Sequence, residues 1–172
     1  MKIWQRNINA FFCVVLAACF LTGCKTTEEK KAEKEETIIK IFLEASSAIN
    51  GDQSDVPVYR SHPVNIHIDT KEILNNMDIT SASVVEVQDG FGLRFTFDPH
   101  GARVLENLSA NNQGKHLVIY AAWPEVRWIG APLIKRRLGK GEMVFTPDAT
   151  REECERIVRG INNVAKRVAK ER

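Results

Sequence analysis

The sequence predicts an α+β fold: a mainly antiparallel sheet with two principal helices, at about 99–110 and 151–170, packed on one face. Three patterns carry this prediction. Apolar and polar residues alternate over 64–69, which is the period of a half-buried strand. The dipeptide Asp89-Gly90 stands between two strand-like runs and indicates a tight hairpin. The C-terminal residues carry apolar side chains at helical spacing.

The first half of the folded part is expected to consist mostly of strands. In chain order it contains an apolar strand over 38–43, a loop over 50–55, a strand over 64–69, a short helical turn over 71–76, and a hairpin of strands 83–88 and 91–97. Apolar residues alternate along the last of these strands at Phe91, Leu93, Phe95 and Phe97. Because successive side chains of a strand point to opposite faces, the four share one face, which the sheet is expected to bury.

The second half begins with a helix whose first residues suit a helix start. Asp98 can accept hydrogen bonds as the N-cap, and Pro99 fits the first helical position. Strands are expected over 116–122, 126–129 and 142–145. At the start of the final helix, Thr150 and Glu153 form a capping-box pattern. The apolar stripe of that helix consists of Cys154, Ile157, Val158, Ile161, Val164, Ala165 and Val168.

The N-terminus has the layout of a secretory signal peptide. Lys2 and Arg6 precede an apolar run over 10–21, which is shorter than the ~20 apolar residues that a helix needs to cross a bilayer. The run ends in Leu21-Thr22-Gly23-Cys24. This tetrapeptide resembles the lipobox of bacterial lipoproteins, in which an aliphatic residue and two small residues precede the cysteine that is modified. The alternatives are an ordinary cleaved signal peptide and a buried N-terminal helix.

The lipobox resemblance implies cleavage before Cys24 and acyl chains such as palmitate on that cysteine. Two or more chains anchor a protein stably to a membrane. The predicted division of the chain is a signal peptide over 1–23, a charged tether over 24–37 and a folded domain over 38–172. We therefore expect the protein in the bacterial cell envelope, facing the periplasm. Lys25 stands where an Asp would favour inner-membrane retention in enteric bacteria, so the outer membrane is favoured.

Composition narrows the range of functions. The chain has 24 Lys and Arg and 22 Asp and Glu; Lys2 and Arg6 leave with the signal peptide, so residues 24–172 carry 22 charges of each sign. This balance gives no reason to expect nucleic acid as a partner. Of four cysteines, only Cys154 remains beside the lipidated Cys24, so no intrachain disulfide is expected. Cys154 lies on the apolar stripe and is expected to behave as a small hydrophobe.

No residue pattern predicts a catalytic centre or a metal site. Among the histidines, only His67 shares a strand face with a second possible ligand, Asp69, and a zinc site needs three or four ligands. No Gly-x-Ser-x-Gly, His-Glu-x-x-His or phosphate-binding motif is present. We therefore expect no enzyme activity, no cofactor and no metal.

The most distinctive surface feature is a concentration of basic residues beside two tryptophans. It consists of Trp123, Arg127, Trp128, Lys135, Arg136, Arg137 and Lys140. Such a surface is suited to anionic lipid or an acidic peptide. The alternative is a solvated rim with the tryptophans at the edge of the core, because runs of charge commonly mark exposed faces.

An ordered series of features extends from Leu93 to Ile161. The series comprises a helix with Gly101 that ends in Leu108-Ser109, Asn112 and Gly114 before an aliphatic strand, an Ala131-Pro132 step, Gly141 before a strand that ends in Phe145-Thr146, and an amphipathic helix that starts with acidic residues. This series resembles the head subdomain of the first periplasmic domain of SecD and SecDF, membrane subunits that assist protein export.

The SecD resemblance implies an α+β head that contacts or shifts with an exported chain and is not a catalytic unit. The sequence departs from that family because no membrane-spanning helix is predicted, so the proton pathway of SecD does not carry over. Trp123-Pro124 also replaces an acidic hairpin turn. We expect a non-enzymatic envelope lipoprotein that acts as a binding or assembly module for extended or unfolded polypeptide. An envelope hydrolase with an unrecognised site and a purely structural lipoprotein are the alternatives, and the oligomeric state stays open.

Overall fold

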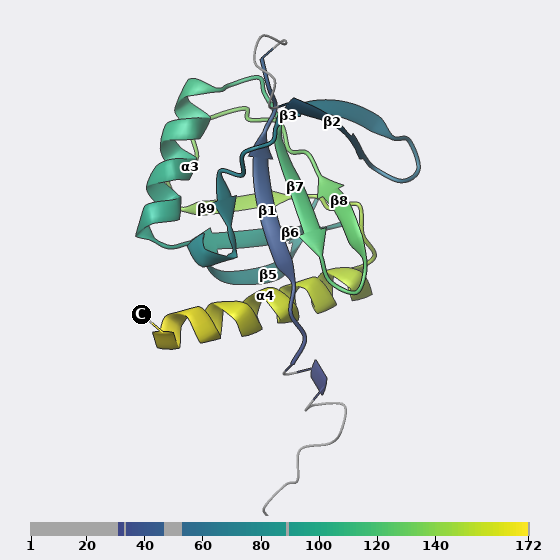
Figure 1. Cartoon of the computed structure of the whole chain (residues 1–172), viewed down its shortest axis with the longest axis vertical. Coiled ribbons are helices and arrows are strands. Elements are labelled where there is room, and N and C mark those ends of the chain that lie inside the picture. Colours follow the sequence, from purple (N-terminus) through teal and green to yellow (C-terminus); the bar gives the residue numbers. More distant parts are fainter. Residues whose placement is uncertain (1–30, 33, 47–52, 89, 172) are drawn as a thin grey trace, which may run out of the picture. The chain divides into compact units, whose positions relative to one another are not determined.

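Antiparallel strands and two long helices, α3 (Pro99–Asn111) and α4 (Arg151–Glu171), make up the protein (Figure 1), so the α+β class is confirmed. The computed structural model describes residues 31–32, 34–46, 53–88 and 90–171; the predicted signal peptide and Cys24 lie outside them. The elements belong to one compact unit, Ala32–Arg172. No helix among the described residues combines the length and hydropathy needed to cross a membrane.

Sheet A lies at the centre of this unit, with the strand order β4-β1-β7-β8 and antiparallel pairing throughout. Its strands are β1 (Ile38–Leu43), β4 (Leu74–Asn75), β7 (Leu117–Ala122) and β8 (Val126–Gly130). Ile39, Ile41 and Ile119 on one face are fully buried in the main core. Phe42 and Val118 on the other face are buried in a second, smaller core. Because both faces are covered there, β1 and β7 are nearly continuous apolar runs in the sequence.

Sheet C closes the main core and has the strand order β5-β6-β9. Its strands are β5 (Ile79–Val87), β6 (Gly90–Phe97) and β9 (Glu142–Phe145). The predicted apolar face of β6 is confirmed: Leu93 and Phe95 are fully buried, and the rings of Phe95 and Phe145 meet edge to face at 5.4 Å. Helix α4 covers the β5 edge, where Asn162 bonds to the backbone N–H and C=O of Ala82 at 2.8 and 3.0 Å.

Both long helices start with the predicted capping chemistry. The Asp98 carboxylate accepts a hydrogen bond from the Gly101 N–H at 2.8 Å. At the start of α4, the Thr150 N–H donates to Glu153 Oε2 at 2.7 Å, and the Glu153 N–H donates to Thr150 Oγ1 at 3.2 Å. These bonds satisfy N–H groups that have no partner within a helix, which is why Asp, Thr and Glu are placed there.

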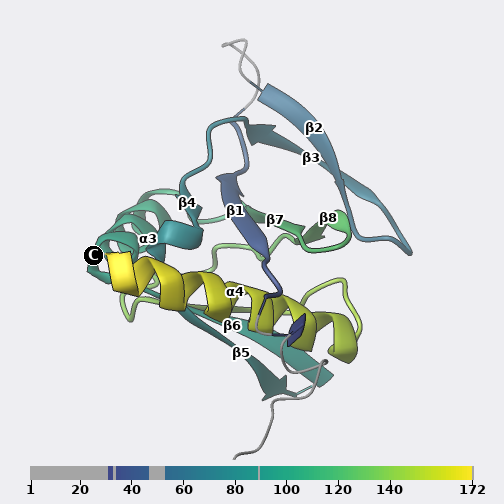
Figure 2. The same ribbon diagram turned by 60° about the horizontal axis from the view of Figure 1, so that its bottom comes forward.

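A hairpin of β2 (Gln53–Val58) and β3 (Val64–Asp69) covers the second core; sheet A lies between this hairpin and sheet C (Figure 2). The loop predicted over 50–55 is therefore wrong over 53–55, while residues 50–52 lie outside the described part. The strand was missed because β2 begins with three polar residues and contains Pro57, and Pro is depleted in strands. Over 71–76, β4 and the start of a short 3₁₀ helix (Asn76–Asp78) take the place of the predicted helical turn.

The last residues of the predicted tether are bound to α4, and we call residues 34–37 the strap. Thr37 is only 1% exposed and lies against Gly160, which has no side chain to displace it. Asn163 Nδ2 donates to the carbonyls of Ala32 and Glu35 at 2.9 and 3.0 Å. The chain therefore enters β1 from a fixed position on α4.

Candidate functional site

The seven residues of the predicted basic surface are divided among three places. Trp123 is 8% exposed in the main core, with the Arg127 guanidinium 5.0 Å from the centre of its ring. Trp128 is half-buried beside the second core and meets the rings of Phe42 and Tyr120 edge to face at 5.4 and 5.3 Å. The other four residues, Lys135, Arg136, Arg137 and Lys140, follow β8 in the segment 132–140.

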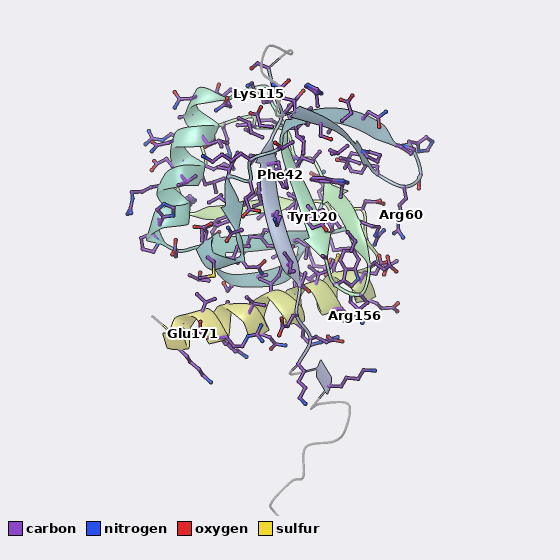
Figure 3. The ribbon with its side chains drawn as sticks, in the orientation of Figure 1. Phe42, Arg60, Lys115, Tyr120, Arg156 and Glu171 are labelled. Atoms are coloured by element: carbon purple, nitrogen blue, oxygen red, sulfur yellow. The ribbon has the colours of Figure 1, made fainter. Side chains whose placement is uncertain are left out.

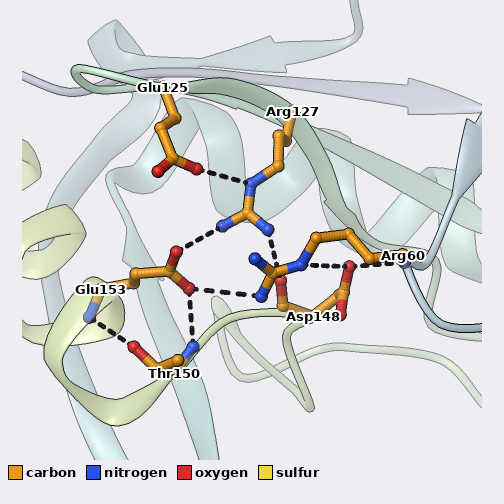
Figure 4. Close-up of polar contacts among 6 residues, drawn as sticks. All are labelled: Arg60, Glu125, Arg127, Asp148, Thr150 and Glu153. Atoms are coloured by element: carbon orange, nitrogen blue, oxygen red, sulfur yellow. Dashed lines mark hydrogen bonds and ion pairs between the residues drawn. The ribbon is translucent and has the colours of Figure 1, made fainter.

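Arg127 is held inside a network of ion pairs (Figure 4). Its Nη2 donates to Glu153 Oε1 at 3.0 Å, and its Nε lies 3.2 Å from Glu125 Oε2 in an ion pair without hydrogen-bond geometry. From the turn between β2 and β3, the Arg60 N–H donates to Asp148 Oδ2 at 2.8 Å. Arg127 therefore joins β8 to the start of α4 and is not free to bind a ligand.

The same network sets the protonation of Glu153. Burial raises the pKa of this carboxyl group, but the hydrogen bond from Thr150 and the nearby Arg127 and Arg60 charges outweigh it, so the pKa is lowered overall. Glu153 therefore stays ionised near neutral pH, and its charge stabilises the joint between the hairpin, β8 and α4.

The segment 132–140 is a rim fixed at several points along its length. It begins as an extension of sheet A, where the Leu117 N–H donates to the Pro132 carbonyl at 3.0 Å. It is then bound to α3: the Leu138 N–H donates to Ser109 Oγ at 2.8 Å, and Arg137 forms an ion pair with Glu106. The rim is therefore bound to both α3 and sheet A.

A groove of about 870 Å³ separates the rim from β9. Its walls carry exposed apolar side chains, since Leu133 on the rim is 43% exposed and Val144 on β9 is 44% exposed. The groove is lined by the rim (132–140), by 142–144 of β9, and by Glu106 and Leu117. It is open to solvent.

Among the described strands, β9 pairs only with β6 in sheet C, so its other edge has no strand beside it. The Phe97 N–H donates to the Gly141 carbonyl at 2.9 Å, so these opposed residues form a hydrogen-bonded pair. Such pairs alternate along an antiparallel ladder, so Glu142 and Val144 direct their backbone groups outward. Among the described residues, no hydrogen bond reaches those outward groups.

Positive charge lies along the rim of the groove. Lys135, Arg136 and Lys140 are exposed, and none forms an ion pair with another residue in the described part of the chain. The two acidic residues of the groove each have a basic neighbour: Glu106 has Arg137, and Glu142 lies 3.9 Å from Arg94. The charge of the groove is therefore suited to an acidic ligand.

Two groups of polar side chains elsewhere have structural roles. Asp78, Asp98 and His100 bring possible ligand atoms within 4.8 Å of one another, but both carboxylates accept backbone hydrogen bonds as caps. His67, which the sequence paired with Asp69, lies on the exposed face of the hairpin with Asp55 and Gln53, each 2.8 Å from one of its ring nitrogens.

Four of the seven residues predicted from the sequence line the groove, and none of the seven lies on β9. Glu142 and Val144 were missed because only the strand order shows that β9 is an edge. Leu133 was missed because an exposed leucine between Pro132 and the buried Ile134 has no periodicity of its own.

No protein-family model matches the chain, and no curated protein matches it significantly. Two solved structures of SecDF are similar to it at 17% identity. One, from work on SecDF as a membrane component that enhances protein export, superposes with a TM-score of 0.56 over 83% of this chain and 71% of that chain. The other, SecDF in a super-membrane-facing form, gives a TM-score of 0.57 over 80% of this chain and 21% of that chain. The likeness confirms a SecD-like fold, and the chain spans about a fifth of the second protein.

Proposed function

We propose that this protein is a non-enzymatic, lipid-anchored module of the bacterial cell envelope that binds extended polypeptide along β9. The observation that carries the proposal is the open β9 edge beside a groove with a basic rim. Adding a strand to such an edge is a common mode of peptide recognition, in which backbone hydrogen bonds give affinity and side-chain contacts give specificity.

The geometry of β9 supports such a complex. A strand added to an edge lies ~4.8 Å away. Residues 142–144 of β9 line the groove, so the groove adjoins this strand. The outward N–H and C=O groups of Glu142 and Val144 supply donors and acceptors, each worth about 0.5–1.5 kcal/mol net. Leu133 and Val144 add apolar contacts. Because β9 is four residues long, the contact is short and the complex is expected to be readily reversible.

The charge of the rim predicts the kind of polypeptide that binds best. Lys135, Arg136 and Lys140 have no ion-pair partner among the described residues, so acidic side chains on the ligand can pair with them. Since these charges are exposed, salt screens them, with a Debye length of ~8 Å at physiological ionic strength. Affinity is therefore expected to be highest for acidic segments and to fall as salt is raised.

The location in the envelope is supported by the N-terminal pattern and by the fold. Leu21-Thr22-Gly23-Cys24 has the form of a lipobox, which would place acyl chains on Cys24. The fold is that of a part of SecDF, a membrane component that enhances protein export. A periplasmic module that holds an extended chain is consistent with both features.

The test is binding of two fluorescent peptides that share an alternating Val/Thr pattern and differ only in carrying Glu or Lys. We expect the Glu peptide to bind more tightly, and the Lys135→Glu/Arg136→Glu variant to lose about tenfold in affinity. The Lys166→Glu/Lys170→Glu variant is the matched control, because it makes the same charge change at exposed positions of α4. Equal affinity of both variants for the Glu peptide contradicts the proposal. Cleavage of the peptide would favour a hydrolase, and absence of binding would favour a structural role.

A further inference from the structure

Three apolar residues form a row across one end of sheet A, on the face that carries the hairpin. Ile38 of β1 is paired with Ala122 of β7, and Ala122 is paired with Val126 of β8. Ile38 is 53% exposed and Val126 is 63% exposed. We call this row the uncovered patch, because the hairpin does not reach it.

Exposure falls in steps from this patch toward the hairpin. In the next row, Tyr120 and Trp128 are half-buried, and beyond them Phe42 and Val118 are buried beneath β2 and β3. Figure 3 shows Phe42 and Tyr120 on the same side of sheet A. The apolar face is thus continuous on β7 and β8, whereas on β1 Lys40 lies between Ile38 and Phe42 and forms an ion pair with Glu72 at 2.8 Å. The described residues cover only part of this face.

The uncovered patch begins where the chain arrives from its N-terminal side. Ile38 directly follows the strap, whose Thr37 is fixed against Gly160 of α4. Seven residues separate Cys24 from Ala32. At ~3.3–3.6 Å per residue, they span at most about 30 Å when fully extended. A lipid-anchored Cys24 would therefore hold this end of sheet A close to a membrane.

We infer that the uncovered patch rests on the surface of the bilayer that holds Cys24, an inference that depends on the lipidation in the proposed function. Ile38 and Val126 supply aliphatic contact with the lipid. The half-buried rings of Tyr120 and Trp128 lie in the next row, and Tyr and Trp are the side chains that favour a lipid–water interface. Exposed Lys34 of the strap adds attraction to anionic lipid.

The acidic residues near the patch do not oppose this contact, because each is paired. Glu35 lies 3.0 Å from Arg159 Nε, Glu36 forms an ion pair with Arg167, and Glu125 is paired with Arg127.

The groove and the uncovered patch lie at opposite ends of β7. Leu133 in the groove is bridged to His116, next to the first residue of β7, whereas Ala122 of the patch is the last residue of that strand. Contact at the patch therefore directs the groove away from the lipid, toward its ligand.

The test places a fluorophore on each end of sheet A in the full-length protein, processed in cells. Val126→Cys and Leu133→Cys are labelled with an environment-sensitive dye, since native Cys154 is fully buried and does not compete. Each protein is reconstituted in vesicles of phosphatidylethanolamine and phosphatidylglycerol, with or without nitroxide-labelled lipid. We expect the nitroxide to quench the dye at position 126 at least about twofold and to leave the dye at 133 nearly unchanged.

The outcomes separate this inference from the proposed function. Equal quenching at the two positions, or none at 126, overturns the inference. A blue-shifted dye at 126 that the nitroxide lipid does not quench also overturns it, because protein then covers the patch. Mass spectrometry of the N-terminal peptide measures acylation of Cys24 separately. An acylated protein with an unquenched dye refutes the inference alone, whereas an unmodified cysteine refutes the lipid anchor as well.

Discussion

Replacing Gly160 with Ala tests whether the strap is held by α4. A Cβ atom at this position would lie 2.2 Å from Thr37 Oγ1, 2.7 Å from the Thr37 nitrogen and 2.9 Å from the Glu36 carbonyl carbon. Two of these three atoms belong to the backbone, so a change of side-chain rotamer cannot relieve the contact. We therefore expect Gly160→Ala to displace the strap from α4.

One favourable and two unfavourable contributions set the change in the free energy of unfolding. Ala is favoured over Gly inside a helix by about 1 kcal/mol. Overpacking a filled site costs about 1–3 kcal/mol, and strap displacement also removes the two hydrogen bonds from Asn163, each worth about 0.5–1.5 kcal/mol. The net expectation is that Gly160→Ala lowers the free energy of unfolding by about 3 kcal/mol.

Urea denaturation measures the loss of stability, and hydrogen exchange of peptides covering 32–40 measures release of the strap. The pair Glu155→Ala and Glu155→Gly is the control, because residue 155 is exposed on the same helix and reports the Ala-to-Gly difference alone. If Gly160→Ala stabilised the protein by about 1 kcal/mol and left strap protection unchanged, the contact between Thr37 and Gly160 would not be a constraint.

Two further predictions concern the start of α4. Burial raises the pKa of the Cys154 thiol to about 11, so this thiol should resist Ellman's reagent at pH 8 until urea unfolds the protein; rapid reaction of the folded protein would contradict its burial. The pKa of Glu153 is lowered in the folded state, so the stability it contributes is present above about pH 4.5 and is lost as pH falls through the lower folded value. Glu153→Gln should lower the free energy of unfolding by about 1 kcal/mol at pH 7 and weaken the dependence of that free energy on acid pH. Urea denaturation curves that are unchanged at pH 7 and below pH 4.5 would argue against the network.

The sequence predicted the elements in which local chemistry and apolar periodicity agree. Helices α3 and α4 were predicted from Asp98-Pro99 and from the Thr150 and Glu153 pair, and both caps are present. The β5–β6 pairing followed from the alternation on either side of the hairpin turn. Strand β2 was missed because its polar start and Pro57 resemble a loop, and only packing on Phe42 and Val118 favours a strand there.

The candidate site was only partly accessible from the sequence. The basic residues of the rim were identified as a surface feature, but the grouping with Trp123 and Trp128 did not hold in space. Trp123 follows the end of β7 and enters the main core, while Trp128 lies on the opposite face of sheet A. The open edge of β9 depends on the order of strands in sheet C, which local patterns do not encode.

Replacing Val144 with Pro tests the proposed strand addition most directly, with binding of the Glu peptide as the measurement. Because Val144 directs its N–H outward, Pro removes no bond of the β6–β9 ladder, and such edge positions tolerate Pro. Val144→Ala is the control, since it shortens the side chain but keeps the N–H. We predict that Val144→Pro stays folded and loses at least about tenfold in affinity, while Val144→Ala stays within about threefold of the unsubstituted protein. Unchanged affinity in a folded Val144→Pro variant would show that polypeptide does not bind along β9.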